Sequence, residues 1–197
     1  MKLKTSFLLC FLVAVAVSSH AANAFPVQYQ IEGLGFGMFG GNPFQMAPFT
    51  LRAEADTSDI MASSGGTAHV ILNDSLTLTI EGVGTGTFLE QTLTATDNII
   101  GQVGFGGITT AGVPSSVVTV DDSSFITYDL STPLPPTSGD STFNSVDSFS
   151  TTFGDLNWDA VINVSFTAAI VPEPTSVVLF AVAALCLVGL RRKSLRD

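Results

Sequence analysis

The chain has 197 residues, 46% of them hydrophobic and 12% charged, and its 17 Asp and Glu against 7 Lys and Arg give a net charge of −10. Residues 25–170 hold 15 of these acids but a single base, Arg52, so nucleic acid and anionic membranes, which are themselves negative, are poor partners. The two cysteines, Cys10 and Cys186, lie near the ends of the chain, so residues 25–170 offer no disulfide, thiol nucleophile or cysteine metal site.

The N-terminal residues 1–24 have the pattern of a cleavable secretory signal peptide. Two lysines near the start precede an apolar run at residues 7–17, and Ala22 and Ala24 form the A-x-A pattern of a cleavage site. We therefore expect the secretion machinery to export the chain and signal peptidase to cut after Ala24, which makes Phe25 the first mature residue. An uncleaved N-terminal anchor is the alternative, although the apolar run is short for a membrane span.

Apolar and polar residues alternate repeatedly along residues 25–170, as they do in strands with one buried face. The alternating segments are 27–32, 49–54, 76–81, 125–130 and 162–170, and residues 68–72 form a further short apolar segment. Glycine-containing breaks at 33–41, 65–66, 82–86, 104–107 and 139 separate these segments. This pattern predicts an all-β fold, an antiparallel β-sandwich or barrel-like domain. Residues 131–152, rich in Pro, Ser and Thr, are predicted to form a long surface loop.

The last alternating segment is predicted to be the final core strand. Its apolar face would comprise Ile162, Val164, Phe166, Ala168 and Ile170. The segment continues into the next part of the sequence without a linker. We therefore expect the folded domain to end immediately before the C-terminal segment.

One acidic segment has the spacing of a calcium site. Asp155, Asn157 and Asp159 match the D-x-N-x-D opening of an EF-hand loop. Ala160 stands where that loop needs Gly, and Phe166 stands where it needs Glu, so the motif is incomplete. A polar turn before the last strand is the favoured interpretation, and a looser calcium site is the alternative.

Catalysis has little support in the sequence. His69 is the only histidine of residues 25–170, it lies in a short apolar segment, and no nucleophile-elbow motif accompanies it. A G-x-G-x-x-G match at residues 35–40 is followed by Gly-Asn-Pro, which does not begin the helix that a nucleotide site needs. We expect no enzyme and no cofactor. Trp158, the only tryptophan, is the focus of an alternative carbohydrate-binding surface.

The C-terminal 27 residues have a distinct organisation. Val171, Pro172, Glu173 and Pro174 precede an uncharged apolar run, Thr175–Leu190, which is followed by Arg191, Arg192 and Lys193. The two prolines fix φ and remove backbone N–H groups, so this segment should be stiff, extended and accessible to a protease, with Glu173 as its charged recognition point. As a helix the apolar run covers about 24 Å, slightly less than a hydrocarbon core, and the basic residues act as a cytoplasmic stop-transfer signal. A plain tail anchor without processing is the alternative.

This C-terminal arrangement resembles the PEP-CTERM family of bacterial sorted proteins. The resemblance implies recognition by an exosortase, a membrane-embedded cysteine protease or transpeptidase of Gram-negative bacteria that make exopolysaccharide. It implies transient anchoring in the inner membrane, cleavage near the motif, and delivery to the cell surface or the extracellular matrix. Many unrelated ectodomains carry this tail, so the resemblance does not define the role of the β-domain.

We therefore expect three parts: a signal peptide (1–24), a secreted β-domain (25–170) and a sorting and anchor segment (171–197). The expected function is that of a non-enzymatic structural component of the exopolysaccharide or biofilm matrix, with exopolysaccharide as a partner and no nucleic acid. The alternative is a carbohydrate- or calcium-dependent binding module, whose oxygen ligands would come from Asp155, Asn157 and Asp159.

Overall fold

The computed structural model describes residues 25–146 and 148–172, most of which lie in β-strands. The strands are β1 (Pro26–Phe39), β2 (Asn42–Asp56), β3 (Met61–Ala62), β4 (Ala68–Leu72), β5 (Ser75–Ile80), β6 (Gly84–Thr87), β7 (Leu93–Asp97), β8 (Gln102–Ile108), β9 (Pro114–Asp121), β10 (Leu134–Phe143), β11 (Phe149–Thr151) and β12 (Gly154–Ile170). Two 3₁₀ helices, η1 (Thr57–Asp59) and η2 (Ser123–Thr127), connect strands. In this part of the chain, no helix has the length and apolar character to cross a membrane. The expected signal helix and C-terminal transmembrane helix lie outside the described residues.

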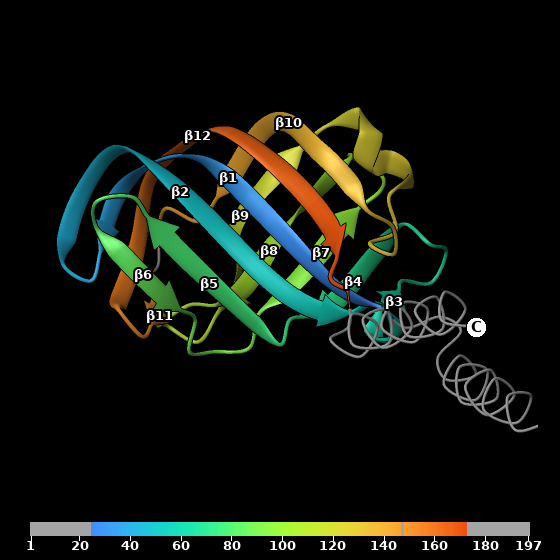
Figure 1. Cartoon of the computed structure of the whole chain (residues 1–197), viewed down its shortest axis with the longest axis horizontal. Helices are drawn as coiled ribbons and strands as arrows, with labels where there is room; N and C mark the ends of the chain where they lie inside the picture. The colour runs from blue at the N-terminus through green and yellow to red at the C-terminus, as the bar shows by residue number, and fades with distance from the viewer. Residues whose placement is uncertain (1–24, 147, 173–197) are drawn as a thin grey trace, which may run out of the picture.

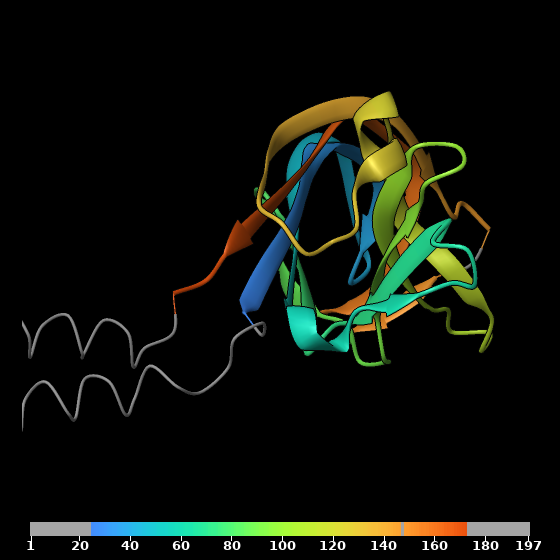
Figure 2. The ribbon, with the colours of Figure 1, turned by 90° about the vertical axis from the view of Figure 1, so that its right-hand side faces the viewer.

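The strands pair into one antiparallel sheet, in the order β3-β4-β7-β8-β9-β10-β12-β1-β2-β5-β6, with β11 added on β12. The sheet curls so that β12, β1, β2, β5 and β6 lie in front of β9, β8, β7 and β4 in Figure 1. The end view in Figure 2 shows the two parts facing each other as a half-barrel. The predicted antiparallel, barrel-like all-β fold is confirmed.

The last strand, β12, joins the two parts of the sheet. Its C-terminal half pairs with β10, its first residues pair with β11, and its other edge pairs with β1 along nearly the whole strand. Near the far end, the Thr152 N–H donates to the Thr87 carbonyl at 2.9 Å, and the Leu89 N–H donates to the Ser150 carbonyl at 3.1 Å. These bonds connect the β6 edge to β11 and close that end of the sheet.

Large aromatic side chains fill the space between the two parts of the sheet. Trp158 is buried against Phe44 and Phe49, with ring centroids 5.8 and 5.0 Å away. Toward the other end, the Tyr29 hydroxyl donates to the Leu130 carbonyl at 2.7 Å in the interior. Aromatic rings of this size bury a large apolar area and prefer tilted or edge contacts, so they account for much of the core packing.

Four of the five expected glycine breaks lie wholly or partly inside strands. β1 continues through the glycine-rich stretch to Phe39, β6 contains glycines 84 and 86, β8 contains glycines 104, 106 and 107, and β10 contains Gly139. In β1 the reason is packing, because a Cβ on Gly35 would lie 2.6 Å from the Trp158 ring. Glycine therefore stands where the alternating pattern has an apolar residue, since the neighbouring aromatic rings occupy the side-chain space.

Two further segments differ from the expectation. The predicted loop at 131–152 contains β10 and β11, and the predicted strand at 125–130 consists of the end of η2 and three irregular residues. Half-buried and exposed positions alternate in β10 from Thr137 to Phe143, but most of the half-buried positions hold small or polar residues, so the sequence lacks the apolar alternation that marks half-buried strands. Its two prolines fall at the register shift between Leu134 and Thr137, where missing N–H groups are tolerated.

The apolar face of the final strand is only partly as predicted. Val164, Phe166 and Ala168 are buried, as expected, but Ile170 is 41% exposed at the end of the strand, and Ile162 is 39% exposed with Val161 buried in its place. The β1–β12 pairing changes register at this point, and Asn163 adopts a positive φ of 53°. This bulge turns the side chains before it to the opposite face, as one extra residue in a strand does.

Candidate functional site

The two ends of the described domain pair with each other. At the open end of the sheet, β1 and β12 place Val27 opposite Ile170 and Gln28 opposite Ala169. The Val171 N–H then donates to the Pro26 carbonyl at 2.8 Å, which is the last bond of this ladder. Figure 1 shows the start of β1 and the end of β12 side by side, so the chain enters and leaves the domain at one point.

Helix η1 fixes the first residue at the same end. The Phe25 nitrogen donates to the Thr57 hydroxyl at 2.9 Å, and the Thr57 N–H donates back to the Phe25 carbonyl at 3.0 Å. Apolar residues remain exposed here, with Phe25 46%, Ile170 41% and Val171 36% exposed. We call this group of ladder and flanking residues, 25–28 and 169–172, the sheet end.

Prolines stop the ladder on both strands. Pro26 can accept the Val171 N–H but has no N–H with which to complete the usual reciprocal pair. Pro172 likewise has no N–H and follows Val171 directly. The backbone pairing therefore ends at Val171, and Pro172 and then Glu173 follow it in the sequence.

The comparison with known protein families bears on this same boundary. The model of the PEP-CTERM protein-sorting motif matches residues 171–193, beginning at the last hydrogen-bonded residue of the sheet. The chain carries a PEP-CTERM sorting motif. The motif implies an exported protein that an exosortase sorts to the cell surface or beyond. No curated protein and no solved structure matches the chain.

Only the beginning of the sorting segment belongs to the described part of the chain. Val171 and Pro172 form the exposed edge of the sheet end. Glu173 and Pro174 lie outside the described residues, as do the stop-transfer residues Arg191, Arg192 and Lys193 and the cleavage-site residues Ala22 and Ala24. The signal peptide therefore stays a prediction. Sequence reasoning located the motif but missed the pairing of Val171 with Pro26 and of Phe25 with Thr57, because these contacts join distant parts of the chain.

The acidic segment near residue 155 is a strand, which corrects the prediction of a polar turn. Asp155, Asn157 and Asp159 alternate on the outer face of β12, whereas Trp158 points inward and is 2% exposed. An extended strand does not wrap oxygen ligands around one ion as an EF-hand loop does. In residues 25–146 and 148–172, no group of three or more His, Cys, Asp and Glu side chains is arranged to hold a metal ion. The burial of Trp158 also means that this residue cannot serve as a carbohydrate platform.

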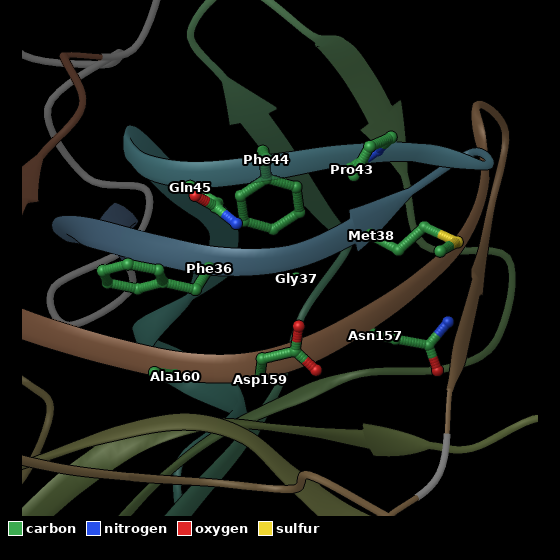
Figure 3. A pocket seen from close by; sticks show the side chains of 9 residues that line it. All are labelled: Phe36, Gly37, Met38, Pro43, Phe44, Gln45, Asn157, Asp159 and Ala160. Carbon is green, nitrogen blue, oxygen red and sulfur yellow. The ribbon is translucent and has the colours of Figure 1, made fainter.

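The outer side chains of this strand do line a shallow hollow of about 410 Å³. Figure 3 shows it spanning β2, β1 and β12, with the Asp159 carboxylate pointing from β12 toward β1. Phe36 is half-buried beside it, and Gln45 and Asn157 contribute amide groups. Gly37 also lines the hollow, where β1 lies close to the backbone of β12. A Cβ on Gly37 would contact the Asn157 carbonyl, and its φ of 151° favours glycine.

His69 belongs to a hydrogen-bond network between strands. Its Nδ1 lies 3.1 Å from the Asn98 side-chain oxygen, and the Asn98 amide donates to the carbonyls of Phe125 and Tyr128, both at 2.9 Å. Asn98 thus links β4 to the segment around η2. Sequence reasoning did not single out Asn98, because its partners are far away along the chain. These contacts give His69 a structural partner in the folded domain.

Proposed function

We propose that exosortase processing releases the β-domain as a non-enzymatic structural component of the extracellular exopolysaccharide or biofilm matrix. The observation that carries this proposal is the position of the sorting motif relative to the sheet. Every strand of the described domain precedes Val171, and the motif begins at that residue. A cut on the C-terminal side of Val171 would free a chain that contains every strand of the described sheet.

The outer surface of the sheet supports a role in contact with polysaccharide. Threonines face each other across β5 and β6, with the Thr79 and Thr85 hydroxyl oxygens 2.9 Å apart and those of Thr77 and Thr87 3.3 Å apart. Each hydroxyl can donate and accept hydrogen bonds, as sugar hydroxyls do. Because residues 25–170 carry a strong negative charge, we expect neutral polysaccharides, or anionic ones bridged by divalent cations, as the matching partners.

Fractionation of the producing host tests this function. The wild-type chain should appear in the medium or matrix, whereas Glu173→Ala should stay with the membrane fraction, as should the wild-type chain in a host without exosortase. Glu90→Ala is the matched control, because it removes one exposed carboxylate far from the motif. Extraction of the released protein with polysaccharide-degrading enzymes would then report whether it resides in the matrix. Normal release of Glu173→Ala would refute exosortase sorting, and recovery only as free protein would refute the matrix role.

A second candidate function is carbohydrate binding at the hollow on the outer face. The hollow is lined by an aromatic ring, a carboxylate and two amides, from Phe36, Asp159, Gln45 and Asn157. Sugar sites combine an apolar ring with a small number of polar groups that fix orientation. In this proposal Phe36 supplies the apolar ring, because Trp158 is buried. Calcium binding at this surface is a separate proposal, in which Asp159 and Asn157, which line the hollow, would supply oxygen ligands.

A glycan array with and without calcium tests the second candidate. Retention of a glycan by the wild-type domain, with loss of binding in both Phe36→Ala and Asp159→Asn, would support it. Glu81→Gln, which changes an exposed carboxylate outside the lining of the hollow, should bind as the wild type does. Equal binding by all variants, or none by the wild type, would refute a glycan site in the hollow.

A further inference from the structure

The sorting motif overlaps the folded sheet by one residue. The family match starts at residue 171, and the Val171 N–H is bonded to the Pro26 carbonyl. Ala169 and Ile170, directly before it, pair with Gln28 and Val27. The residues on the N-terminal side of the motif are therefore strand residues, and no linker separates them from the recognition segment.

A protease or transpeptidase that binds its substrate as an extended chain uses the main-chain N–H and C=O groups of the residues around the cut. On the N-terminal side of this motif, β1 already uses some of those groups. The neighbouring β10 also reaches this region, with Leu134 opposite Ala168. The same backbone cannot pair with β1 and with an enzyme groove along one edge at once.

We propose that the sheet end controls exosortase cleavage: residues 169–171 must separate from β1 before the enzyme can engage the motif. This inference rests on the proposed exosortase sorting. The opening breaks hydrogen bonds only. Cleavage follows as a separate step, in which one peptide bond breaks and its acyl group passes to water or to an amine acceptor. Residues 25–28 of β1 compete with the enzyme for the backbone of residues 169–171, so the strength of this pairing sets the rate of release from the membrane.

A reversible staple across the sheet end tests the proposal. Gln28→Cys with Ala169→Cys places two thiols on directly opposite residues of the outer face, and antiparallel neighbours lie within the Cα separation that a disulfide spans. In a pulse-chase experiment on the full chain, the oxidised form should be processed at least about tenfold more slowly than the reduced form. Thr79→Cys with Thr85→Cys is the matched control, because it staples β5 to β6 away from the sheet end. Its oxidised and reduced forms should be processed equally fast.

A second variant acts in the opposite direction. Six Gly and Ser residues inserted between Ile170 and Val171 should speed processing, because the motif is then freed from the ladder without any opening of β1. The same insertion between Gly65 and Gly66, an exposed turn, should leave the rate unchanged. Equal rates for the oxidised and reduced sheet-end staple, or an unchanged rate for the linker variant, would overturn the control step. Normal processing of Glu173→Ala would instead overturn exosortase sorting itself, so the two failures are distinguishable.

Discussion

The packing of Trp158 over Gly35 gives a stability prediction that follows from one missing side chain. Gly35 lies in β1 beneath the largest aromatic group of the core. A Cβ added there would lie 2.6 Å from Cζ3 of Trp158, 3.1 Å from Cε2 of Phe44 and 3.4 Å from Cδ1 of Phe49. The first distance is a clash, and the atoms involved belong to rigid rings that are themselves buried. Gly35→Ala must therefore displace the tryptophan or the backbone of β1.

Two opposing terms set the size of this effect. Overpacking of a well-packed core costs about 1–3 kcal/mol. Replacement of a strand glycine by alanine returns about 0.5–1 kcal/mol, because the unfolded chain loses less conformational freedom on folding. Because the clash falls on rigid buried rings, the upper half of the overpacking range applies, about 2–3 kcal/mol, and we expect Gly35→Ala to lower the free energy of unfolding by about 1–2.5 kcal/mol. For a domain of this size, that loss lowers Tm by about 3–10 °C.

Urea unfolding of the domain spanning residues 25–171 measures the effect. Tryptophan fluorescence is a suitable signal, because Trp158 is the only tryptophan and it contacts the substituted position. The control is Gly107→Ala in β8, another buried strand glycine, where the added Cβ would find its nearest neighbours at 3.5, 3.6 and 3.7 Å. These are ordinary contacts, so Gly107→Ala should be neutral or stabilising by up to about 1 kcal/mol.

The comparison of the two alanine variants decides between packing and a general effect of glycine. If Gly35→Ala were as stable as the wild type, or as stable as Gly107→Ala, then Trp158 would not pack over β1 as described. An equal loss in both variants would indicate that these strands tolerate no side chain at all. Either result would refute the packing explanation for the glycines of β1.

Three further predictions concern the folded domain in solution. Trp158 emission should be blue-shifted in the folded domain and should shift to the red on unfolding, since the ring is 2% exposed; red emission under native conditions would contradict its burial. Burial raises the pKa of Tyr29 and of Tyr128, and the nearby Asp129 raises both further. The unfolded chain therefore releases these two protons first, so the free energy of unfolding should be constant below pH about 10 and should fall as the pH rises above it. An unchanged urea midpoint above pH about 10 would refute this. Added sodium chloride should raise Tm by screening the repulsion among the acidic residues, and calcium at equal ionic strength should add to this only if it binds specifically.

Local sequence patterns predicted the strands whose two faces differ. The segments around Ile31, Leu51, Leu78 and Phe166 alternate in sequence and are buried on one face in the structure. The pattern failed where glycine replaces the apolar member, as at Gly35, because the side chain that fills the space comes from another strand. It failed again in β10, where half-buried and exposed positions alternate but Thr137, Gly139 and Ser141 stand at the half-buried positions in place of apolar residues.

The candidate site likewise has one part that the sequence predicted and one part that only the structure shows. The sorting motif is a continuous segment, so its residues, order and spacing could be recognised from the sequence. The sheet end depends on contacts between opposite ends of the domain, such as Val171 with Pro26, and no local pattern encodes that pairing. The hollow beside Asp159 likewise needs three strands in register. The sequence did indicate oxygen ligands near residue 155, but only the strand geometry shows that they face outward while Trp158 faces the core.

The central claim is that exosortase cuts the chain at the end of the sheet and releases the intact β-domain. The most direct test is the intact mass of the protein recovered from the medium and matrix of the producing host. We expect a chain that begins at Phe25 and ends between Val171 and Pro174, with all strands from β1 to β12 retained. A mass that still includes the apolar run and the basic residues up to Asp197 would contradict processing and would indicate a permanent membrane anchor.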